Sequence, residues 1–355
     1  LTNRSLIELA SKQLLDEYRK EGKIFKTNLT IDEQEELPDL KDSKNIQVIS
    51  GSLFLATFFI SSGYAKDISH EPPFDYVIVD EASQALLAML SAAAKLGKKT
   101  IFIGDPYQLP PVVEVNKDII NKKNGIYYIE GFNTICTNLS IPSYQLNETH
   151  RLPQRAAEYT GIFYQNTLVS RANKKVRLQF QECDGKLNKY LHPQGGPVLI
   201  KSNFPIGHDD PDFGLFLIIN FLKQFFVIQE PNLNIAIITK TKKAVRAIQK
   251  IVADTFGSDE RIRIDTVERI QGLTCDFTIF FIPNSKINFS LKKSFFNVAT
   301  SRAKRHTIII ADKSILAYQI TDKNVYDFLT KLDNEFSFTI EPGQPIVDNK
   351  SLPFH

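Results

Sequence analysis

Short hydrophobic runs alternate along the chain with longer stretches that have helical periodicity. In the first part of the chain, the strand candidates are Gln47–Ser50, Leu53–Phe59, Tyr76–Val79 and Thr100–Ile103. A second set follows a helix that begins near Leu152 and consists of Pro197–Ile200, Asn234–Ile238, Arg261–Thr266, Phe277–Phe281 and Thr307–Ile310. Runs this short and this rich in β-branched and aromatic residues are typical of strands buried on both faces. The pattern predicts an α/β fold with mostly parallel sheets and helices on both faces.

The succession of strands and helices occurs twice, which predicts two domains. We place the boundary within Ser140–His150, so that the first domain spans residues 1–145 and the second spans residues 146–346. The final residues, 347–355, lack periodicity and are expected to form a tail. A chain of 355 residues, 43% hydrophobic and 23% charged, is long enough to bury two such cores.

Composition narrows the class of protein only slightly. No apolar run reaches the roughly 18 to 20 uncharged residues of a membrane span, and residues 1–15 follow an amphipathic helix pattern rather than a signal peptide. We therefore expect an intracellular protein without a membrane partner, cytoplasmic or nuclear, or nucleoid-associated if bacterial. The three cysteines lack metal-ligand spacing, which predicts no structural zinc. The net charge of +3 is too small to identify a polyanionic partner.

The hydrophobic strand at Tyr76–Val79 is followed by two adjacent acids, Asp80 and Glu81. One carboxylate at such a strand end can bind Mg²⁺, and the next can orient or deprotonate a water molecule. A site that hydrolyses a nucleoside triphosphate needs both roles side by side. The alternative is that the two acids merely begin the following helix, where they interact favourably with the positive end of its dipole.

The loop after the strand at Thr100–Ile103 favours the hydrolytic interpretation. Gly104 allows a tight turn, Pro106 stiffens the loop, and Gln108 carries an amide that can contact a phosphate oxygen or the attacking water. An ordinary surface turn requires none of these groups. Because the carboxyl ends of parallel strands meet at one edge of a sheet, we expect the two loops to lie side by side.

Together, DEASQ at residues 80–84 and GDPYQLPPV at residues 104–112 resemble motifs II and III of superfamily 1 helicases. The resemblance is to the branch that contains the nonsense-mediated decay RNA helicase, senataxin and the immunoglobulin mu-binding helicase. Other segments resemble further motifs of the family in the expected order: Thr2–Ser5, Leu55–Thr57, Thr149–Pro153, Ile235–Thr241, Thr266–Asp276 and Asn297–Arg302. The resemblance covers residues 2–311 and implies two RecA-like domains, of which the first is incomplete at its N-terminus.

The resemblance implies roles for individual residues around a bound nucleotide. Asp80 would hold Mg²⁺, Glu81 would activate the attacking water, and Gln108 would sense the γ-phosphate of ATP. Arg151 and Arg302 would act as arginine fingers from the second domain, because two guanidinium groups can neutralise the charge that develops on the transferred phosphoryl group. The alternative for each arginine is a surface or salt-bridging role.

Two further residues, Gln271 and Gly272, would lie close to the nucleotide by the same resemblance. The chain departs from the family just beyond them, because it has Thr274 where relatives usually have an acid. The resemblance therefore does not imply a ribose or phosphate contact at Thr274.

A nucleic-acid groove is also implied by the resemblance. The residues that would contact phosphates and sugars of single-stranded DNA or RNA are Thr57, Ser61, Thr239, Lys240 and Thr266. Short hydroxyl side chains at strand ends are as often helix caps or turn formers. The basic residues that follow Lys240 could belong to this groove or could equally form a solvated helix face.

One motif that such an enzyme requires is missing from the sequence. ATP binding uses a G-x-x-x-x-G-K-[ST] loop after the first strand, whose backbone amides and lysine surround the phosphates. The nearest string, Leu96–Thr100, has Ala92 in place of the first glycine and precedes a strand instead of following one. We therefore expect the chain to be part of a longer helicase whose upstream region carries the loop, and to be inactive alone.

Three functions compete at this point. The first is a motor fragment of an ATP-dependent helicase or translocase, 5′ to 3′ by resemblance, that uses ATP and Mg²⁺ and binds single-stranded DNA or RNA. The second is a non-catalytic nucleic-acid-binding or scaffold module derived from a helicase. The third, another P-loop enzyme such as a kinase-like phosphotransferase, would leave the arginine motifs without a purpose. The joint presence of Asp80, Glu81, Gln108, Arg151 and Arg302 favours the first.

Overall fold

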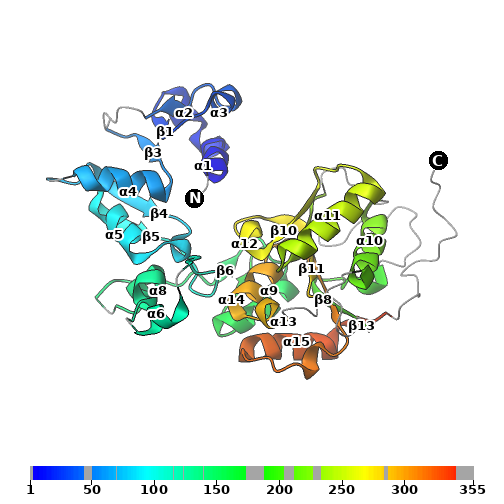
Figure 1. Ribbon diagram of the computed structural model, residues 1–355. Coiled ribbons are helices and arrows are strands. Elements are labelled where there is room, and N and C mark those ends of the chain that lie inside the picture. The colour runs from blue at the N-terminus through cyan, green and yellow to red at the C-terminus, as the bar shows by residue number, and fades with distance from the viewer. Residues whose placement is uncertain are drawn as a thin grey trace. The chain divides into compact units, whose positions relative to one another are not determined.

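The computed structural model describes residues 3–43, 50–68, 70–114, 116–122, 124–138, 140–172, 188–203, 212–226, 233–283 and 287–340. The chain forms two compact units, residues 1–143 and residues 144–355 (Figure 1). Every strand pair in the described part of the chain is parallel. The predicted α/β fold with mostly parallel sheets is therefore confirmed.

The first unit contains two small sheets. In one sheet, β1 (Ile24–Lys26) lies between β2 (Lys41–Asp42) and β3 (Leu53–Leu55); in the other, β4 (Phe74–Val79) pairs with β5 (Gly97–Phe102). The helices of this unit are α1 (Asn3–Ala10), α2 (Asp16–Lys20), α3 (Ile31–Glu36), α4 (Phe58–Asp67), α5 (Leu87–Lys95), α6 (Lys117–Lys122), α7 (Ile126–Ile129) and α8 (Gly131–Cys136). The sheet β2-β1-β3 has its own small core, in which Leu6 and Ile7 of α1 pack with Ile24 and Leu55.

The predicted strand Leu53–Phe59 is only half correct. Strand β3 ends at Leu55, and helix α4 begins at Phe58. Thr57 has an extended backbone (φ −79°, ψ 161°), and its carbonyl oxygen accepts a hydrogen bond from the backbone N–H of Ser61 at 3.0 Å. Because the apolar run continues from the strand into the first turn of the helix, hydrophobicity alone does not mark the boundary. The other early candidate, Gln47–Ser50, lies outside the described residues except for its last position.

Strands β4 and β5 are covered on one face only, although the sequence predicts burial on both. Val79 and Phe102 pack into a core with residues of α4, α5 and α8. Tyr76, Ile78 and Ile101 alternate with them along the strands, and 59%, 63% and 48% of their surfaces are exposed. Among the described residues, helices cover only the face that carries Val79 and Phe102. The apolar face that carries Tyr76, Ile78 and Ile101 is exposed.

The second unit is built on one six-stranded parallel sheet. Its strands are β8 (Gly196–Ser202), β9 (Ile235–Thr239), β10 (Ile262–Thr266), β11 (Cys275–Phe281), β12 (Ala303–Asp312) and β13 (Ser337–Thr339), in the order β10-β9-β11-β12-β8-β13. The helices are α9 (Gln154–Gly161), α10 (Asp212–Phe226), α11 (Lys242–Phe256), α12 (Val267–Ile270), α13 (Ile287–Ser290), α14 (Lys293–Thr300) and α15 (Lys323–Glu335). A separate short pair consists of β6 (Glu148–Thr149) and β7 (Val169–Ser170).

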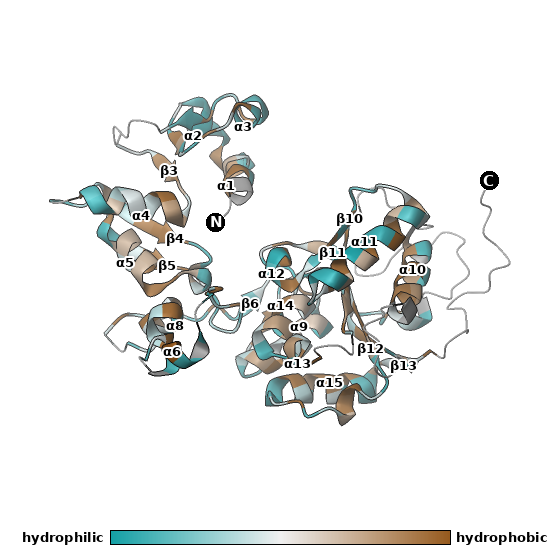
Figure 2. Cartoon of the chain, viewed as in Figure 1, coloured by the Kyte–Doolittle hydropathy of each residue, from teal (hydrophilic) through white to brown (hydrophobic). Residues whose placement is uncertain are grey.

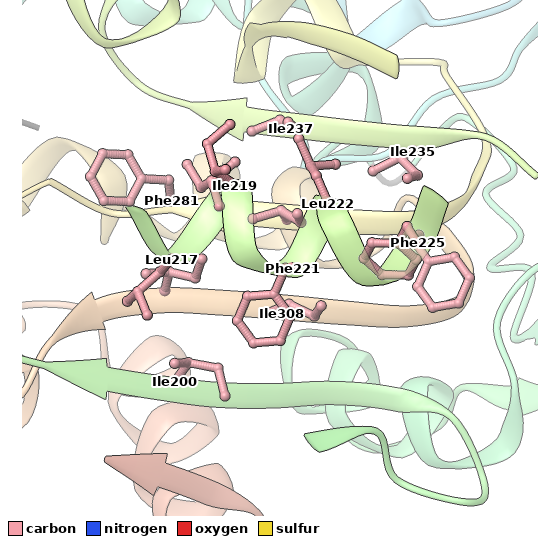
Figure 3. Close-up of a cluster of buried hydrophobic side chains, with 14 of the residues drawn as sticks. Ile200, Leu217, Ile219, Phe221, Leu222, Phe225, Ile235, Ile237, Phe281 and Ile308 are labelled. Atoms are coloured by element: carbon pink, nitrogen blue, oxygen red, sulfur yellow. The ribbon is translucent and has the colours of Figure 1, made fainter. Parts of the chain in front are cut away.

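Helices cover both faces of this sheet, as the sequence predicts. Figure 3 shows the core beneath α10, where Leu217 and Phe221 pack with Ile237 and Ile308 of the strands. Helix α11 is amphipathic (Figure 2), with an apolar side that includes Ile248 and faces the same core. On the opposite face, α14 and α15 contribute an aromatic cluster in which the Phe280 and Phe296 rings lie 5.8 Å apart. The strands β9 and β11 are buried almost throughout.

None of the helices in the described part of the chain combines the length and the apolar character that a bilayer crossing requires.

Helix α10 packs tightly against the sheet at Gly214. A Cβ atom at this position would lie 2.1 Å from the ring of Phe281, which is buried in the core. We expect Gly214→Ala to lower the free energy of unfolding of the second unit by about 2 kcal/mol, because overpacking outweighs the better helix propensity of alanine. Urea unfolding followed by circular dichroism measures this change.

Gly161→Ala in α9 is the matched control. A Cβ atom at Gly161 would meet its nearest neighbour at 3.6 Å, an ordinary contact. This substitution is expected to leave the stability unchanged or to raise it by up to about 1 kcal/mol. Equal effects of the two substitutions would contradict the role of Gly214.

Candidate functional site

The loops that follow β4 and β5 are joined by backbone hydrogen bonds at one edge of their sheet. The N–H of Ile103 donates to the carbonyl oxygen of Val79, and the N–H of Ala82 donates to the carbonyl oxygen of Ile103, both at 2.8 Å. A Cβ atom at Gly104 would lie 2.8 Å from the backbone nitrogen of Ser83. The structure thus gives a different reason for Gly104 from the expected tight turn: the glycine permits the two loops to touch.

Glu81 has a left-handed backbone, with φ 53° and ψ 36°. Such a conformation costs a residue with a side chain on the order of 1 kcal/mol, and strained positions cluster at functional sites. The exposed Asp80 accepts a hydrogen bond from the N–H of Glu81 through Oδ1 at 2.9 Å, and the Gln84 amide donates to Glu81 Oε2 at 3.0 Å. Both carboxylates therefore have defined positions at the strand end.

The two acids precede only a short helical turn, and the structure shows no capping of it by Glu81. Residues Ala82–Gln84 form a single 3₁₀ turn, and the side chain of Glu81 makes no capping hydrogen bond to it. The following α-helix, α5, begins only at Leu87.

Gln108 is oriented by Asp105, a residue to which the sequence analysis gives no role. Asp105 accepts a hydrogen bond from the Gln108 side chain through Oδ2 and one from the N–H of Tyr107 through Oδ1, both at 2.9 Å. The N–H of Gln108 also donates to the carbonyl oxygen of Asp105 at 3.1 Å. The signal that could have identified Asp105 is its place three residues before the amide, where an Asp commonly organises a turn.

The donor set at the strand end fits Mg²⁺ held mainly by a substrate. Among the described residues, no group of three or more His, Cys, Asp and Glu side chains could hold a metal ion. Mg²⁺ in nucleotide sites is bound by one or two carboxylates, with phosphates and waters as the other ligands. The exposed carboxylate of Asp80 satisfies this requirement.

In the second unit, Ser301 brings Arg151 and Arg302 together. Arg151 donates through Nη1 to the carbonyl oxygen of Ser301 at 3.3 Å, and Arg302 donates through Nη2 to the Ser301 hydroxyl at 3.2 Å. The turn that presents Arg151 is shaped by Thr149, whose hydroxyl accepts from the N–H groups of Arg151 and Leu152. Ser301 is a second residue that the sequence analysis missed.

Arg302 does not have the surface role that was its alternative. Its surface is only 2% exposed, and its Nε donates to the carbonyl oxygen of Val298 at 3.0 Å. Arg151 is more accessible. The two arginines therefore differ in burial.

The loop that contains Gln271 and Gly272 connects α12 to β11. Gly272 has φ 82°, in the left-handed region that favours glycine. Directly after the loop, the N–H of Cys275 donates to the carbonyl oxygen of Arg302 at 3.2 Å. This hydrogen bond places the end of the loop next to the backbone of Arg302. Burial raises the pKa of the Cys275 thiol, which keeps this group neutral.

The predicted nucleic-acid residues occupy strand ends and helix starts. Thr239 and Thr266 are partners at the carboxyl ends of β9 and β10, and both are buried. Thr57 and Thr266 occupy N-cap positions of α4 and α12, but neither side chain makes a capping hydrogen bond. Ser61 donates its hydroxyl to the carbonyl oxygen of Phe58 within α4 at 3.0 Å. Among the described residues, Thr239 Oγ1 has no hydrogen-bond partner.

Lys240 is engaged by two residues that the sequence analysis did not identify. Its Nζ forms an ion pair with Glu268 Oε1 and lies 3.7 Å from the centre of the Phe295 ring. This ammonium group is therefore not free for a phosphate in the described arrangement. No sequence signal indicated the pair, because its members lie on different elements.

Comparison with known proteins gives matches over most of the chain. Two models of the AAA domain match residues 8–115 and residues 214–314, together more than half of the chain. The DNA replication ATP-dependent helicase/nuclease dna2 of Schizosaccharomyces pombe is 26% identical over an alignment of 306 residues that covers 79% of this chain and 21% of that protein. The 5'-3' DNA helicase ZGRF1 of Mus musculus is 25% identical over an alignment of 249 residues that covers 68% of this chain and 13% of that protein.

The chain thus spans about a fifth or less of the length of these two relatives. Among solved structures, Mss116p bound to ssRNA and AMP-PNP aligns with 97% of this chain and 63% of its own, at 10% identity and a TM-score of 0.46. The matched AAA domains and the helicase relatives agree with the motifs found in order along the sequence. The chain belongs to the superfamily 1 helicases.

Proposed function

We propose that the chain is the motor part of an ATP-dependent helicase or translocase that moves 5′ to 3′ on a single strand. The observation that carries this proposal is the backbone connection between the loops after β4 and β5, which sets Asp80, Glu81 and Gln108 at one sheet edge. In this proposal Asp80 holds Mg²⁺, Glu81 orients the attacking water, and Gln108 contacts the γ-phosphate of ATP. Bound Mg²⁺ supplies positive charge to the phosphates.

The second unit contributes positive charge in the same proposal. Arg151 and Arg302 supply guanidinium groups to the phosphates, and Ser301 fixes their spacing because it accepts a hydrogen bond from each. Gln271 and Gly272 lie near the nucleotide. This assignment is supported by the hydrogen bond from Cys275, which follows their loop, to the backbone of Arg302.

The nucleic-acid contacts are proposed along the ends of β9, β10 and the start of α4. Thr57, Ser61, Thr239, Lys240 and Thr266 would hold the sugar-phosphate backbone, which requires no sequence readout. Support for 5′ to 3′ movement and for DNA comes from the relatives, since one is a 5'-3' DNA helicase and the other a DNA replication helicase. Contacts to a backbone would also permit RNA.

The open face of β4 and β5 supports the proposal that a further segment of the protein completes the first unit. Tyr76, Ile78 and Ile101 form an apolar surface on a parallel sheet, and parallel sheets are almost always covered on both faces. We propose that the segment with the phosphate-binding loop, which the 355 residues lack, packs against this face.

A non-catalytic nucleic-acid-binding module is the second candidate, and the missing loop favours it. Binding to a polyanion is common to both candidates, whereas hydrolysis separates them.

We expect the chain to bind a single-stranded oligonucleotide with an affinity that falls steeply with salt. Each phosphate that a lysine or arginine neutralises makes the slope of log K against log salt concentration more negative by about 0.7. The hydroxyl contacts release no counterions, but exposed Lys242 and Arg246 at the start of α11 can each neutralise a phosphate, so the slope is expected to be about −1.4. Fluorescence anisotropy of labelled oligo(dT) between 50 and about 200 mM salt measures it.

A polypeptide that extends this chain through a phosphate-binding loop provides the second measurement. The motor proposal requires that it hydrolyse ATP and that single strands accelerate the hydrolysis. Salt-dependent binding without hydrolysis would support the non-catalytic candidate. A flat salt response would contradict both candidates.

A further inference from the structure

We propose that Glu268 is a built-in competitor for Lys240, which holds this lysine away from nucleic-acid phosphates and weakens binding until the ion pair opens. The proposal rests on the proposed nucleic-acid function and adds a regulatory residue to it. In this proposal Glu268 opposes nucleic-acid binding, whereas residues that contact the sugar-phosphate backbone promote it.

The geometry places one carboxylate where a phosphate oxygen would otherwise bind. Lys240 follows the last residue of β9, and Glu268 lies in α12, directly after the neighbouring strand β10. Their ion pair joins Lys240 Nζ to Glu268 Oε1. A carboxylate and a phosphate present the same kind of charged oxygen to an ammonium group, so only one of them can occupy this position.

Phe295 fixes the lysine in this arrangement. The Nζ atom lies 3.7 Å from the centre of the ring, within the range of a cation–π interaction. Phe295 belongs to α14, so the Lys240 side chain connects three elements. The lysine side chain is only 15% exposed, and a pair this shielded is screened less by salt than a surface pair.

The Glu268 carboxylate is not fully satisfied by Lys240. Its Oε2 atom is buried and has no hydrogen-bond partner among the described residues. A buried acceptor without a partner costs free energy, which makes this pair easier to open than one with both oxygens bonded. The adjacent Thr239 hydroxyl is buried and likewise lacks a partner in the described part of the chain.

Opening the pair would expose the lysine beside other positive groups. Helix α11 starts two residues after Lys240, and exposed Lys242 and Arg246 lie in its first turns. A helix start of this kind attracts anions, and the basic side chains add to the attraction. Glu268 is the negative charge placed against this group, and its removal is expected to increase binding.

The test compares Glu268→Gln with Asp254→Asn in the full chain. Binding of a labelled oligo(dT) is measured by fluorescence anisotropy at several salt concentrations. Glu268→Gln is expected to raise affinity about fivefold and to steepen the salt slope by about 0.7, because one more lysine becomes available to a phosphate. Asp254→Asn removes an exposed acid from the far half of α11 and is expected to change affinity less than about twofold.

A double substitution identifies the lysine as the target. In Lys240→Met/Glu268→Gln, affinity is expected to equal that of Lys240→Met alone, since no ammonium group remains for Glu268 to occupy. An affinity gain that survives the loss of Lys240, or a gain equal to that of Asp254→Asn, would overturn the proposal. So would a lower melting temperature for Glu268→Gln with unchanged affinity, which indicates a purely structural pair. If the unaltered chain shows no salt-dependent binding, the proposed function itself fails.

Discussion

Glu81→Gln is expected to lower kcat for ATP hydrolysis about 10³-fold while nucleotide affinity stays nearly unchanged. The amide has the shape of the carboxylate and can still accept the hydrogen bond from Gln84, so the left-handed backbone and the loop should be preserved. It cannot take a proton from the attacking water. The measurement is steady-state hydrolysis in the extended polypeptide that carries a phosphate-binding loop, together with binding of a fluorescent nucleotide analogue.

Asp75→Asn is the control for Glu81→Gln. Asp75 lies near the opposite end of the same strand, β4, where its exposed carboxylate pairs with Lys98 at 3.0 Å. This substitution removes one negative charge from β4 without touching the loops, and kcat is expected to change less than about twofold. Full turnover by Glu81→Gln, or an equal loss in both variants, would contradict the assignment of Glu81 to the water.

The sequence predicted the second sheet better than the first, and the reason is physical. The strands β9 and β11 are buried almost throughout, so each forms a continuous apolar run with polar residues beyond its ends. Near Thr57 this contrast is absent, because strand, turn and helix are all apolar to the same degree. The predicted strand Leu53–Phe59 therefore ran two residues into helix α4, whose start depends on backbone dihedral angles.

The same contrast explains which site residues the sequence indicated. Asp80 and Glu81 directly follow an apolar strand, and Gln108 lies in the loop after the next strand, so their place at a sheet edge can be inferred from the pattern alone. Ser301 is different, since its role arises from contact with Arg151, which is 150 residues away in the chain. Ser301 lies between α14 and β12, and only the folded chain brings it next to Arg151. No local sequence pattern predicts this contact.

Arg302→Ala and Arg151→Ala are expected to lose hydrolysis to a similar extent but to differ in stability. Each removes a guanidinium group proposed to lie near the transferred phosphoryl group, and the loss is expected to be about 10³-fold in kcat. Arg302→Ala should also lower the free energy of unfolding of the second unit by about 3 kcal/mol, because it leaves the buried oxygens of Val298 and Ser301 without their donors. For Arg151→Ala, which is more accessible, a loss below about 1 kcal/mol is expected.

Arg302→Lys separates the two contributions of Arg302. Lysine keeps the charge but has a single donor position instead of a planar fork, so it cannot donate to Val298 and Ser301 in the arrangement that Arg302 uses. We expect it to recover part of the stability and little of the activity, as judged by urea unfolding and by hydrolysis in the extended polypeptide. Recovery of both to the unsubstituted level would show that any positive charge suffices at this position. Loss of stability without loss of activity in Arg302→Ala would assign Arg302 to the core rather than to the phosphates.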